Sequence, residues 1–401
     1  MIDLTSSIRR CSVVFDSSAP HRPEAPPTTL LTLPLELLEE ILLRIPAVAD
    51  LACVSIRRIV TDHVFLHRFR ASHLLPLLGI LSARSSRNQL MLQLAQPPHP
   101  SAAAASTLAG FHAADFSCSF LPSAKRWWGR FSCLESARDL AVCDPLYRCY
   151  ILLPVIPDDL AALAQPPDTL HFEPFLAPPA VQDEGDMSFR VICLVQCTTK
   201  LVLIIFSSGS GARQWHAITF DNWINLLTGS ANPAPDNDPS RNGGRGCAFY
   251  PGSKLLMLDT RGMDFSAVNL PPGTNNTQVA ILEAGKGRIG MFINQDMTNE
   301  VSYNLLQNDG DGAMFQWLSE AMFNLPENNR YLLLGIAGGY LLLQGLPGDR
   351  HSSSLAEKED PNVFSLNLKT LQLEWFLASK YNNFDADLFA GFPPSLSLPT
   401  L

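Results

Sequence analysis

Residues 140–154 read LAVCDPLYRCYILLP, an apolar run followed by a turn and a second apolar run. Asp144 and Pro145 open the turn, because proline fixes its own φ and the aspartate side chain can bond the turn backbone. The same order recurs at 255–271 (LLMLDTRGMDFSAVNLP) and at 363–376 (VFSLNLKTLQLEWF). Each of the three stretches therefore predicts a strand, a turn and a second strand.

Further short apolar runs extend this pattern over most of the chain. They lie at 189–196, 201–206, 215–220, 279–282, 289–293 and 331–335. Many short strands separated by turns at a spacing of about 8–12 residues predict a sandwich, a barrel or a propeller. The stretch from 109 to the end is long for one sandwich, and at about 40–50 residues per blade it would make about six or seven propeller blades. We therefore expect a large all-β, propeller-like domain over 109–401.

The N-terminal part has a different character. Residues 1–29 are rich in Ser and Pro and predict a disordered leader. Residues 30–72 carry helical periodicity, beginning with LPLELLEEILLRIP at 33–46, where the apolar positions form one broad helix face and Pro46 ends the helix. Residues 73–108 contain PPHPSAAAAS at 97–106 and are expected to connect the two parts. The predicted fold class is thus α+β, with a small helical N-terminal domain and a large all-β domain.

Composition excludes several classes of protein. The 401 residues are 46% hydrophobic and 17% charged, unlike a disordered chain, and the net charge of −9 argues against a general nucleic-acid binder. The KRWWGR cluster at 125–130 could stack nucleic acid or bind a protein, but we favour a strand edge anchored by tryptophan. The longest apolar run, 331–343, is interrupted by glycine and is shorter than the about 20 residues of a membrane span. With no secretory signal pattern, we expect a chain that binds neither nucleic acid nor membrane and works in the cytoplasm, the nucleus or both.

The cysteines argue against a metal site. There are nine, with no CxxC, and the close pairs Cys143/Cys149 and Cys193/Cys197 have no histidine at zinc-finger spacing. Cys193 and Cys197 lie in an apolar run, so buried thiols are expected. The scattered, odd-numbered set is typical of a reducing compartment.

One glycine motif suggests a cofactor at first sight. Residues 285–290 read GKGRIG and match the G-x-G-x-x-G fingerprint of dinucleotide sites. That site requires a helix directly after the motif, whereas the next residues have a strand pattern. We expect a glycine-rich hairpin here, and neither a cofactor site nor a set of catalytic residues is predicted.

The run at 33–46 closely resembles an F-box. The continuation RRIVTDHVFLHRFR at 57–70 is similar to the end of the F-box in a large, grass-expanded group of plant F-box proteins. The stretches at 143–154 and at 390–399 (AGFPPSLSLP) are similar to parts of the same group. The resemblance implies a non-catalytic substrate-recognition subunit of an SCF-type ubiquitin ligase. Its F-box would dock a Skp-type adaptor, and its β-rich domain would hold a target protein whose identity the sequence does not give.

The resemblance also assigns positions to the adaptor contact. The residues that match adaptor-facing positions are Leu33, Pro34, Leu37, Leu38, Ile41, Leu42 and Ile45, and Ile56 stands where the family has an aromatic residue before its Arg pair. The stretch between Pro46 and Arg57 is shorter than in the family by about five residues, more than one helical turn. An alternative is therefore a degenerate F-box protein that acts as an interaction scaffold outside the ligase. A third alternative, an enzyme housed in the β-rich domain, would require a pocket of convergent acids and a histidine.

Overall fold

The computed structural model shows a chain that is mostly β-strand, with few helices. The structure describes residues 34–43, 62–84, 89–111, 114–122, 140–164, 168–177, 189–209, 214–221, 223, 248–249, 254–260, 262–271, 274, 277–285, 288–295, 298–308, 315–327, 329–347, 361–379 and 386–391.

The strands form antiparallel sheets that follow one another along the chain. Three sheets are four-stranded meanders. They contain β5 (Thr169–Ala177), β6 (Arg190–Cys197), β7 (Lys200–Ser207) and β8 (Trp215–Asp221); β12 (Gln278–Glu283), β13 (Ile289–Asn294), β14 (Glu300–Asn308) and β15 (Phe315–Asn324); and β16 (Asn329–Ala337), β17 (Tyr340–Pro347), β18 (Asn362–Asn367) and β19 (Leu373–Ala378). The smaller sheets contain β9 (Ala248–Phe249), β10 (Lys254–Asp259) and β11 (Asp264–Asn269); the hairpin β3 (Ala141–Asp144) and β4 (Cys149–Leu152); and β1 (Leu77–Arg84), β2 (Gln89–Leu94) and β20 (Asp387–Ala390).

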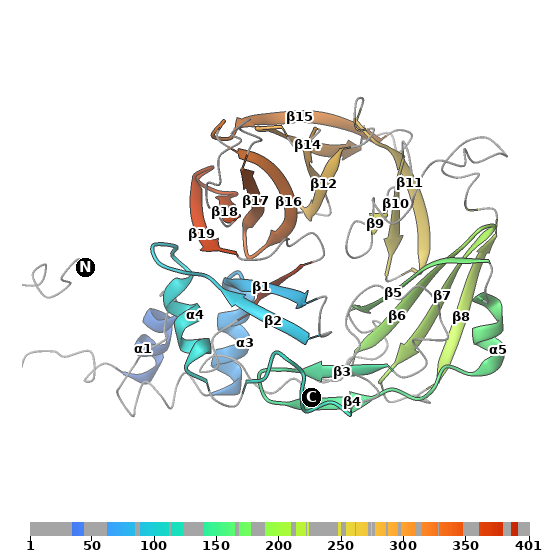
Figure 1. Ribbon diagram of the computed structural model, residues 1–401. Helices are drawn as coiled ribbons and strands as arrows, with labels where there is room; N and C mark the ends of the chain where they lie inside the picture. The colour runs from blue at the N-terminus through green and yellow to red at the C-terminus, as the bar shows by residue number, and fades with distance from the viewer. Residues whose placement is uncertain are drawn as a thin grey trace, which may run out of the picture.

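Figure 1 shows that these sheets lie around a ring, in the order in which they occur in the sequence. Apolar clusters join each sheet to the next. One cluster links β6 and β7 to β10, another links β10 to β13, and a third links the β12–β15 sheet to the β16–β19 sheet. Further clusters link the β16–β19 sheet to β1, and β1 to the region of β3. The arrangement is propeller-like, as the spacing of the apolar runs predicts.

The ring is closed by pairing between the two ends of the β-rich part. Strand β20 pairs with β1, with Ile80 opposite Leu388 and Leu81 opposite Asp387. This pairing brings β1 and β2, which lie in the predicted connecting segment 73–108, into a sheet of the ring. The local sequence does not reveal this, because the partner strand lies near the opposite end of the chain.

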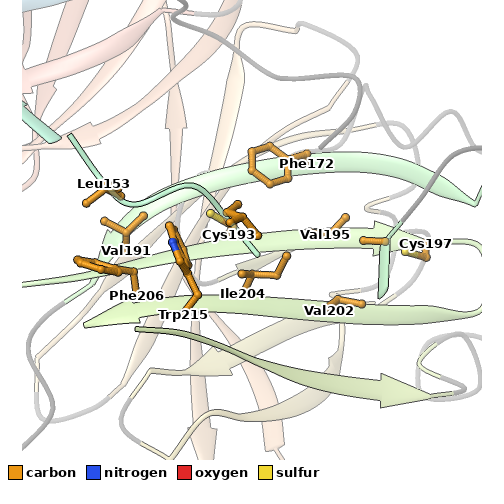
Figure 2. Packing of buried hydrophobic residues seen from close by; sticks show 12 residues of the cluster. Leu153, Phe172, Val191, Cys193, Val195, Cys197, Val202, Ile204, Phe206 and Trp215 are labelled. Atoms are coloured by element: carbon orange, nitrogen blue, oxygen red, sulfur yellow. The ribbon is translucent and has the colours of Figure 1, made fainter. Parts of the chain in front are cut away.

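The β5–β8 sheet shows why some strands have uninterrupted apolar sequences. Side chains of β6 and β7 alternate between two faces. One face packs against the segment from Leu153 to Ala164, as Figure 2 shows for part of the cluster. The other face packs against β10 and β11. Because both faces are covered, every residue of β6 is buried, and the thiols of Cys193 and Cys197 are among them, as predicted.

The expected strand pairs are confirmed at 140–154, 255–271 and 363–376, where β3/β4, β10/β11 and β18/β19 lie. The six further runs expected as strands correspond to β6, β7, β8, β12, β13 and β16. The apolar run at 331–343 is in fact two antiparallel strands, β16 and β17. They turn back on each other at Gly338 and Gly339, whose φ values of 59° and 81° suit glycine.

Four α-helices accompany the ring in the described part of the chain. They are α1 (Leu35–Leu42), α3 (His63–Ser72), α4 (Ala102–Ala109) and α5 (Asp158–Ala161), which continues into a 3-10 turn, η4 (Ala162–Ala164). Helix α4 lies in the predicted connecting segment and contains the alanine run, a sequence with high helix propensity. None of the described helices has both the length and the apolar character needed to cross a bilayer.

Candidate functional site: the helix pair α1 and α3

Helix α1 presents two distinct faces. It begins after Pro34, whose carbonyl oxygen accepts a hydrogen bond from the Leu38 amide (3.0 Å). Leu38 and Leu42 lie one turn apart and are buried, with Leu38 only 3% exposed. Leu37, rotated by about 100° from Leu38, is 53% exposed. The apolar stripe of this helix is therefore divided between the interior of the molecule and its surface.

Helix α3 is divided in the same way. Asp62 caps its N-terminus by accepting hydrogen bonds from the amides of Val64 (2.9 Å) and Phe65 (3.1 Å). Phe65 and Phe69 are fully buried and stack one turn apart, with ring centroids 5.9 Å apart. Val64 and Arg68, each about 100° around the helix from the phenylalanine that follows it, are exposed. An interior aromatic face and an exterior mixed face follow from the spacing of these side chains.

An arginine joins the two helices. Arg68 of α3 donates to the carboxylates of Glu39 (2.5 Å) and Glu40 (2.7 Å) on α1. The hydrogen bond to Glu40 raises the pKa of Arg68, so its charge persists at every physiological pH. All three side chains are partly exposed, and such pairs contribute little to stability. They connect α1 to α3 at the surface of the molecule.

Exposed apolar side chains are concentrated in this part of the chain. Twelve large apolar side chains are exposed among the described residues, and four of them come from the short stretch between 37 and 75. These four are Leu37, Val64, Leu74 and Leu75. A single exposed leucine needs no explanation, but several from one small helical unit are typical of a surface that another protein covers.

The structure places the predicted adaptor-facing residues in different environments. Pro34 and Leu37 are exposed, and Ile41 is half-buried. Leu38 and Leu42 are buried within the chain. Leu33, Ile45 and Ile56 lie outside the described residues, as does the whole of the shortened stretch between Pro46 and Arg57. The exposure of Val64, Leu74 and Leu75 was not predicted, because position in a periodic pattern does not show which side of a helix packs inward.

The helix pair is attached to the ring by a close backbone contact. After α3, residues 73–76 lead directly into β1. The chain passes over the turn between β16 and β17, where a Cβ on Gly338 would lie 2.6 Å from the Leu75 carbonyl oxygen and 2.8 Å from the Leu77 amide nitrogen. The Pro76 carbonyl oxygen also accepts a hydrogen bond from the Gly391 amide, just beyond β20 (3.1 Å). Both strands of the ring closure therefore lie at the base of the helix pair.

A buried histidine fixes the segment between β2 and α4 against the β16–β19 sheet. The imidazole of His99 lies between the rings of Tyr340 and Phe376, at centroid distances of 5.2 and 4.8 Å. Its Nδ1 accepts a hydrogen bond from the Ser101 amide (3.1 Å), so the neutral ring carries its proton on Nε2, 3.8 Å from Glu374 Oε2. Burial lowers the pKa of His99 to about 4. The side chain is thus a neutral structural group at physiological pH.

The structure describes part of one of the two remaining sequence motifs. The strands β12 and β13, which the motif at 285–290 follows and enters, pair antiparallel, and Gly285 has a φ of 76°, so the predicted glycine hairpin is confirmed. The cluster at 125–130 lies outside the described residues. Within the described ranges, no group of three or more His, Cys, Asp or Glu side chains is placed to bind a metal ion.

Comparisons with known proteins do not assign the chain to a family. No family model matches it, and no curated protein matches it. Among solved structures, a match is found to an exo-beta-1,3-galactanase from Phanerochaete chrysosporium, at 10% identity and a TM-score of 0.24. The match covers 49% of this chain and 48% of the galactanase chain, and a likeness this low supports no conclusion about function.

Proposed function

We propose that this chain is the substrate-recognition subunit of an SCF-type ubiquitin ligase. In this role the α1/α3 unit docks a Skp-type adaptor, and the β-ring binds the target protein. The chain performs no bond chemistry itself. It raises the effective concentration of the target near the ubiquitin-loaded enzyme of the complex.

The main support is the exposed apolar surface of the helix unit. The stretch that resembles an F-box contains helix α1. The Leu37 side chain of this helix is exposed, whereas that of its neighbour Leu38 is buried. Burying a leucine side chain yields about 1.5–3 kcal/mol, so a partner that covers Leu37 gains binding energy that folding leaves unused. Val64 on α3 extends the exposed apolar character beyond α1.

The two faces of α1 divide the proposed adaptor-facing residues by role. Leu38 and Leu42 hold the helix in place from within, because both are buried before any partner arrives. Pro34 and Leu37 contact the adaptor, and Ile41 lies at the margin of that contact. A substitution at Leu38 would therefore disturb folding, whereas a substitution at Leu37 tests docking alone.

The target-binding half of the proposal has its own candidate surface. Tyr150, Ile151 and Leu152 are consecutive exposed residues of β4, and Val155 is exposed just after them. This is the second concentration of exposed apolar side chains in the described part of the chain, and it lies on the ring at a distance along the sequence from the helix pair. We assign target binding to this edge of the β3–β4 hairpin.

The decisive measurement is binding of the full-length chain to a purified Skp-type adaptor. We expect micromolar or tighter affinity, and Leu37→Glu should weaken it at least about tenfold, because a buried carboxylate replaces an apolar contact. Met322→Glu is the matched control, since Met322 is also exposed but lies on β15. Circular dichroism should show that both variants are folded.

Two results would contradict the proposal. Absence of binding by the folded wild-type chain at micromolar adaptor would favour the non-ligase scaffold, which the shortened stretch before Arg57 also suggests. Equal affinity of the Leu37→Glu variant and the wild type would mean that the adaptor, if bound, uses another surface.

A further inference from the structure

Two adjacent strands of the β5–β8 sheet bring a histidine, a glutamate and a glutamine together. His171 and Glu173 lie two positions apart on β5, so their side chains leave the same face of the sheet. Gln196 lies on β6 directly opposite His171, and its side chain leaves that face as well. It is the face that packs toward β10 and β11 through Leu194.

Polar atoms of two of these side chains lack ordinary partners. Gln196 is only 4% exposed, and its Oε1 accepts no hydrogen bond from the part of the chain that the structure describes. The Nε2 atom of His171 is likewise buried and makes no hydrogen bond within the same residues. A buried polar atom without a hydrogen-bond partner is costly, so two of them on opposite positions of one strand pair indicate a ligand-binding position.

The spacing of His171 and Glu173 suits a shared metal ion better than a hydrogen bond. Nε2 of His171 lies 3.6 Å from Oε2 of Glu173. A charge-assisted hydrogen bond between these atoms would be about 2.7–2.9 Å long. Two ligand atoms that bind one zinc ion at about 2.1 Å in tetrahedral geometry are about 3.4 Å apart. The observed separation is therefore close to one edge of such a tetrahedron, and it is too short for a water molecule to lie between the two atoms.

A β-bulge in β5 creates this arrangement. Thr169 lies opposite Cys197, so a regular ladder would put Leu170 opposite Gln196, but the register shifts and His171 lies there instead. The bulge thus moves His171 and Glu173 to the face of Gln196, and bulges that re-aim side chains are frequent beside functional sites. Strand β5 is the edge of its sheet, and the His171 and Glu173 side chains keep 15% and 19% of their surface exposed. An ion therefore has a short path to the pair from solvent.

We propose that His171, Glu173 and Gln196 bind a divalent transition-metal ion, for which zinc is the best match. His171 supplies Nε2, Glu173 its carboxylate and Gln196 its amide oxygen, and solvent takes the fourth position. The imidazole ligand argues against calcium and magnesium, which prefer oxygen ligands. Because one ligand is a neutral amide, we expect micromolar affinity. Two ligands come from β5 and one from β6, so the bound ion fastens the edge strand to its sheet.

The test titrates zinc chloride into the full-length protein after a chelator has been applied and removed. Calorimetry should show a site of micromolar affinity, and saturating zinc should raise the thermal midpoint of unfolding. Glu173→Gln and Gln196→Leu should each weaken this site at least about tenfold, since each removes a ligand atom. His216→Ala is the matched control, because His216 is exposed on β8, at the other edge of the same sheet, and should leave the affinity unchanged.

Cobalt(II) serves as a second probe, because its absorption spectrum reveals whether sulfur is a ligand. The first equivalent should give no sulfur-to-cobalt charge-transfer band, and such a band would place the ion on cysteines and overturn the proposal. Absence of a micromolar zinc site in the folded wild type would show that His171 and Glu173 form an ordinary ion pair. Unchanged affinity in Glu173→Gln would also refute the site, and this variant decides if Gln196→Leu, with its buried position, does not fold by circular dichroism.

Discussion

Replacing Gly338 by alanine should loosen the junction between the helix pair and the β-ring. Gly338 turns the chain between β16 and β17 at a φ of 59°. The backbone that descends from α3 lies against it, so that an added Cβ would meet the Leu75 carbonyl oxygen at 2.6 Å and the Leu77 amide nitrogen at 2.8 Å. Both atoms belong to the backbone and cannot swing away as the end of a side chain can.

The expected loss of stability in Gly338→Ala has two separate contributions. A left-handed backbone conformation costs an alanine roughly 1–2 kcal/mol relative to glycine. Forcing a methyl group into a packed site costs typically about 1–3 kcal/mol more. Gly285→Ala is the matched control, because Gly285 has a φ of 76° but no atom within 4 Å of its added Cβ. We therefore expect losses of about 2–5 kcal/mol for Gly338→Ala and of about 1–2 kcal/mol for Gly285→Ala.

Urea unfolding followed by circular dichroism measures both free energies. The difference between the two variants, about 1–3 kcal/mol, isolates the contact between the turn and residues 75–77. Equal losses in the two variants would refute the reasoning, because they would show that the helix pair does not rest on this turn. A larger loss for Gly285→Ala would do so even more directly.

Two further predictions concern the pH dependence of stability and a helix cap. His99 has a folded pKa of about 4 and an unfolded pKa of about 6.5, so the unfolded chain takes up the proton first. Stability should therefore fall by about 3 kcal/mol as the pH drops from 6.5 to 4 and depend no further on this group below 4, an effect that urea unfolding at several pH values should find reduced in His99→Gln. The titratable groups that face the imidazole of His99 are Glu374 and Tyr340. The Glu374 carboxylate can only make this loss of stability smaller. Asp62→Ala removes two hydrogen bonds at the start of α3 and should cost about 1 kcal/mol, whereas Asp62→Asn, which keeps an acceptor, should cost less by the same assay.

The strands that sequence reasoning found share one property. They carry apolar side chains at every position or at alternate positions, as in β6, β7 and β13. Some of the strands that it missed lack this signal. In β15, which lies at one edge of its sheet, the polar residues Gln316, Ser319 and Glu320 are exposed. A strand with one paired edge and little buried surface leaves only a weak periodic pattern.

Long-range strand pairing is the second reason why the sequence prediction and the structure differ. Strand β1 becomes part of a sheet because β20 pairs with it, and no local window of sequence contains both strands. Helix α4 was missed for another reason, since its alanines were interpreted as a low-complexity connection although Ala102, Ala105 and Leu108 are buried in the fold. The high helix propensity of alanine favours α4, and packing of the three buried side chains then stabilises it in the fold.

The sequence predicts where the helix of the candidate site lies, but not which of its side chains are exposed. The run at 33–46 predicts an amphipathic helix, and α1 lies within it. Leu37 and Leu38 are chemically identical neighbours, yet one faces the surface and the other faces the interior. Which of the two is buried depends on tertiary packing, and the contact of α1 with α3 through Arg68, Glu39 and Glu40 joins residues almost 30 positions apart. Periodicity gives the width of an apolar face but not its division between core and partner.

The attachment of the helix pair decides whether the proposed receptor can work as a unit. A receptor that held adaptor and target on a flexible tether would present the target over a wide range of positions, and its effective concentration at the transfer site would fall. Here residues 73–76 run straight from α3 into β1, rest on the Gly338 turn and share a hydrogen bond with Gly391. The unit that carries Leu37 is thus joined to the strands that close the ring. In the proposed receptor, adaptor docking at one end would therefore fix the orientation of the ring, and with it the place at which a bound target is presented.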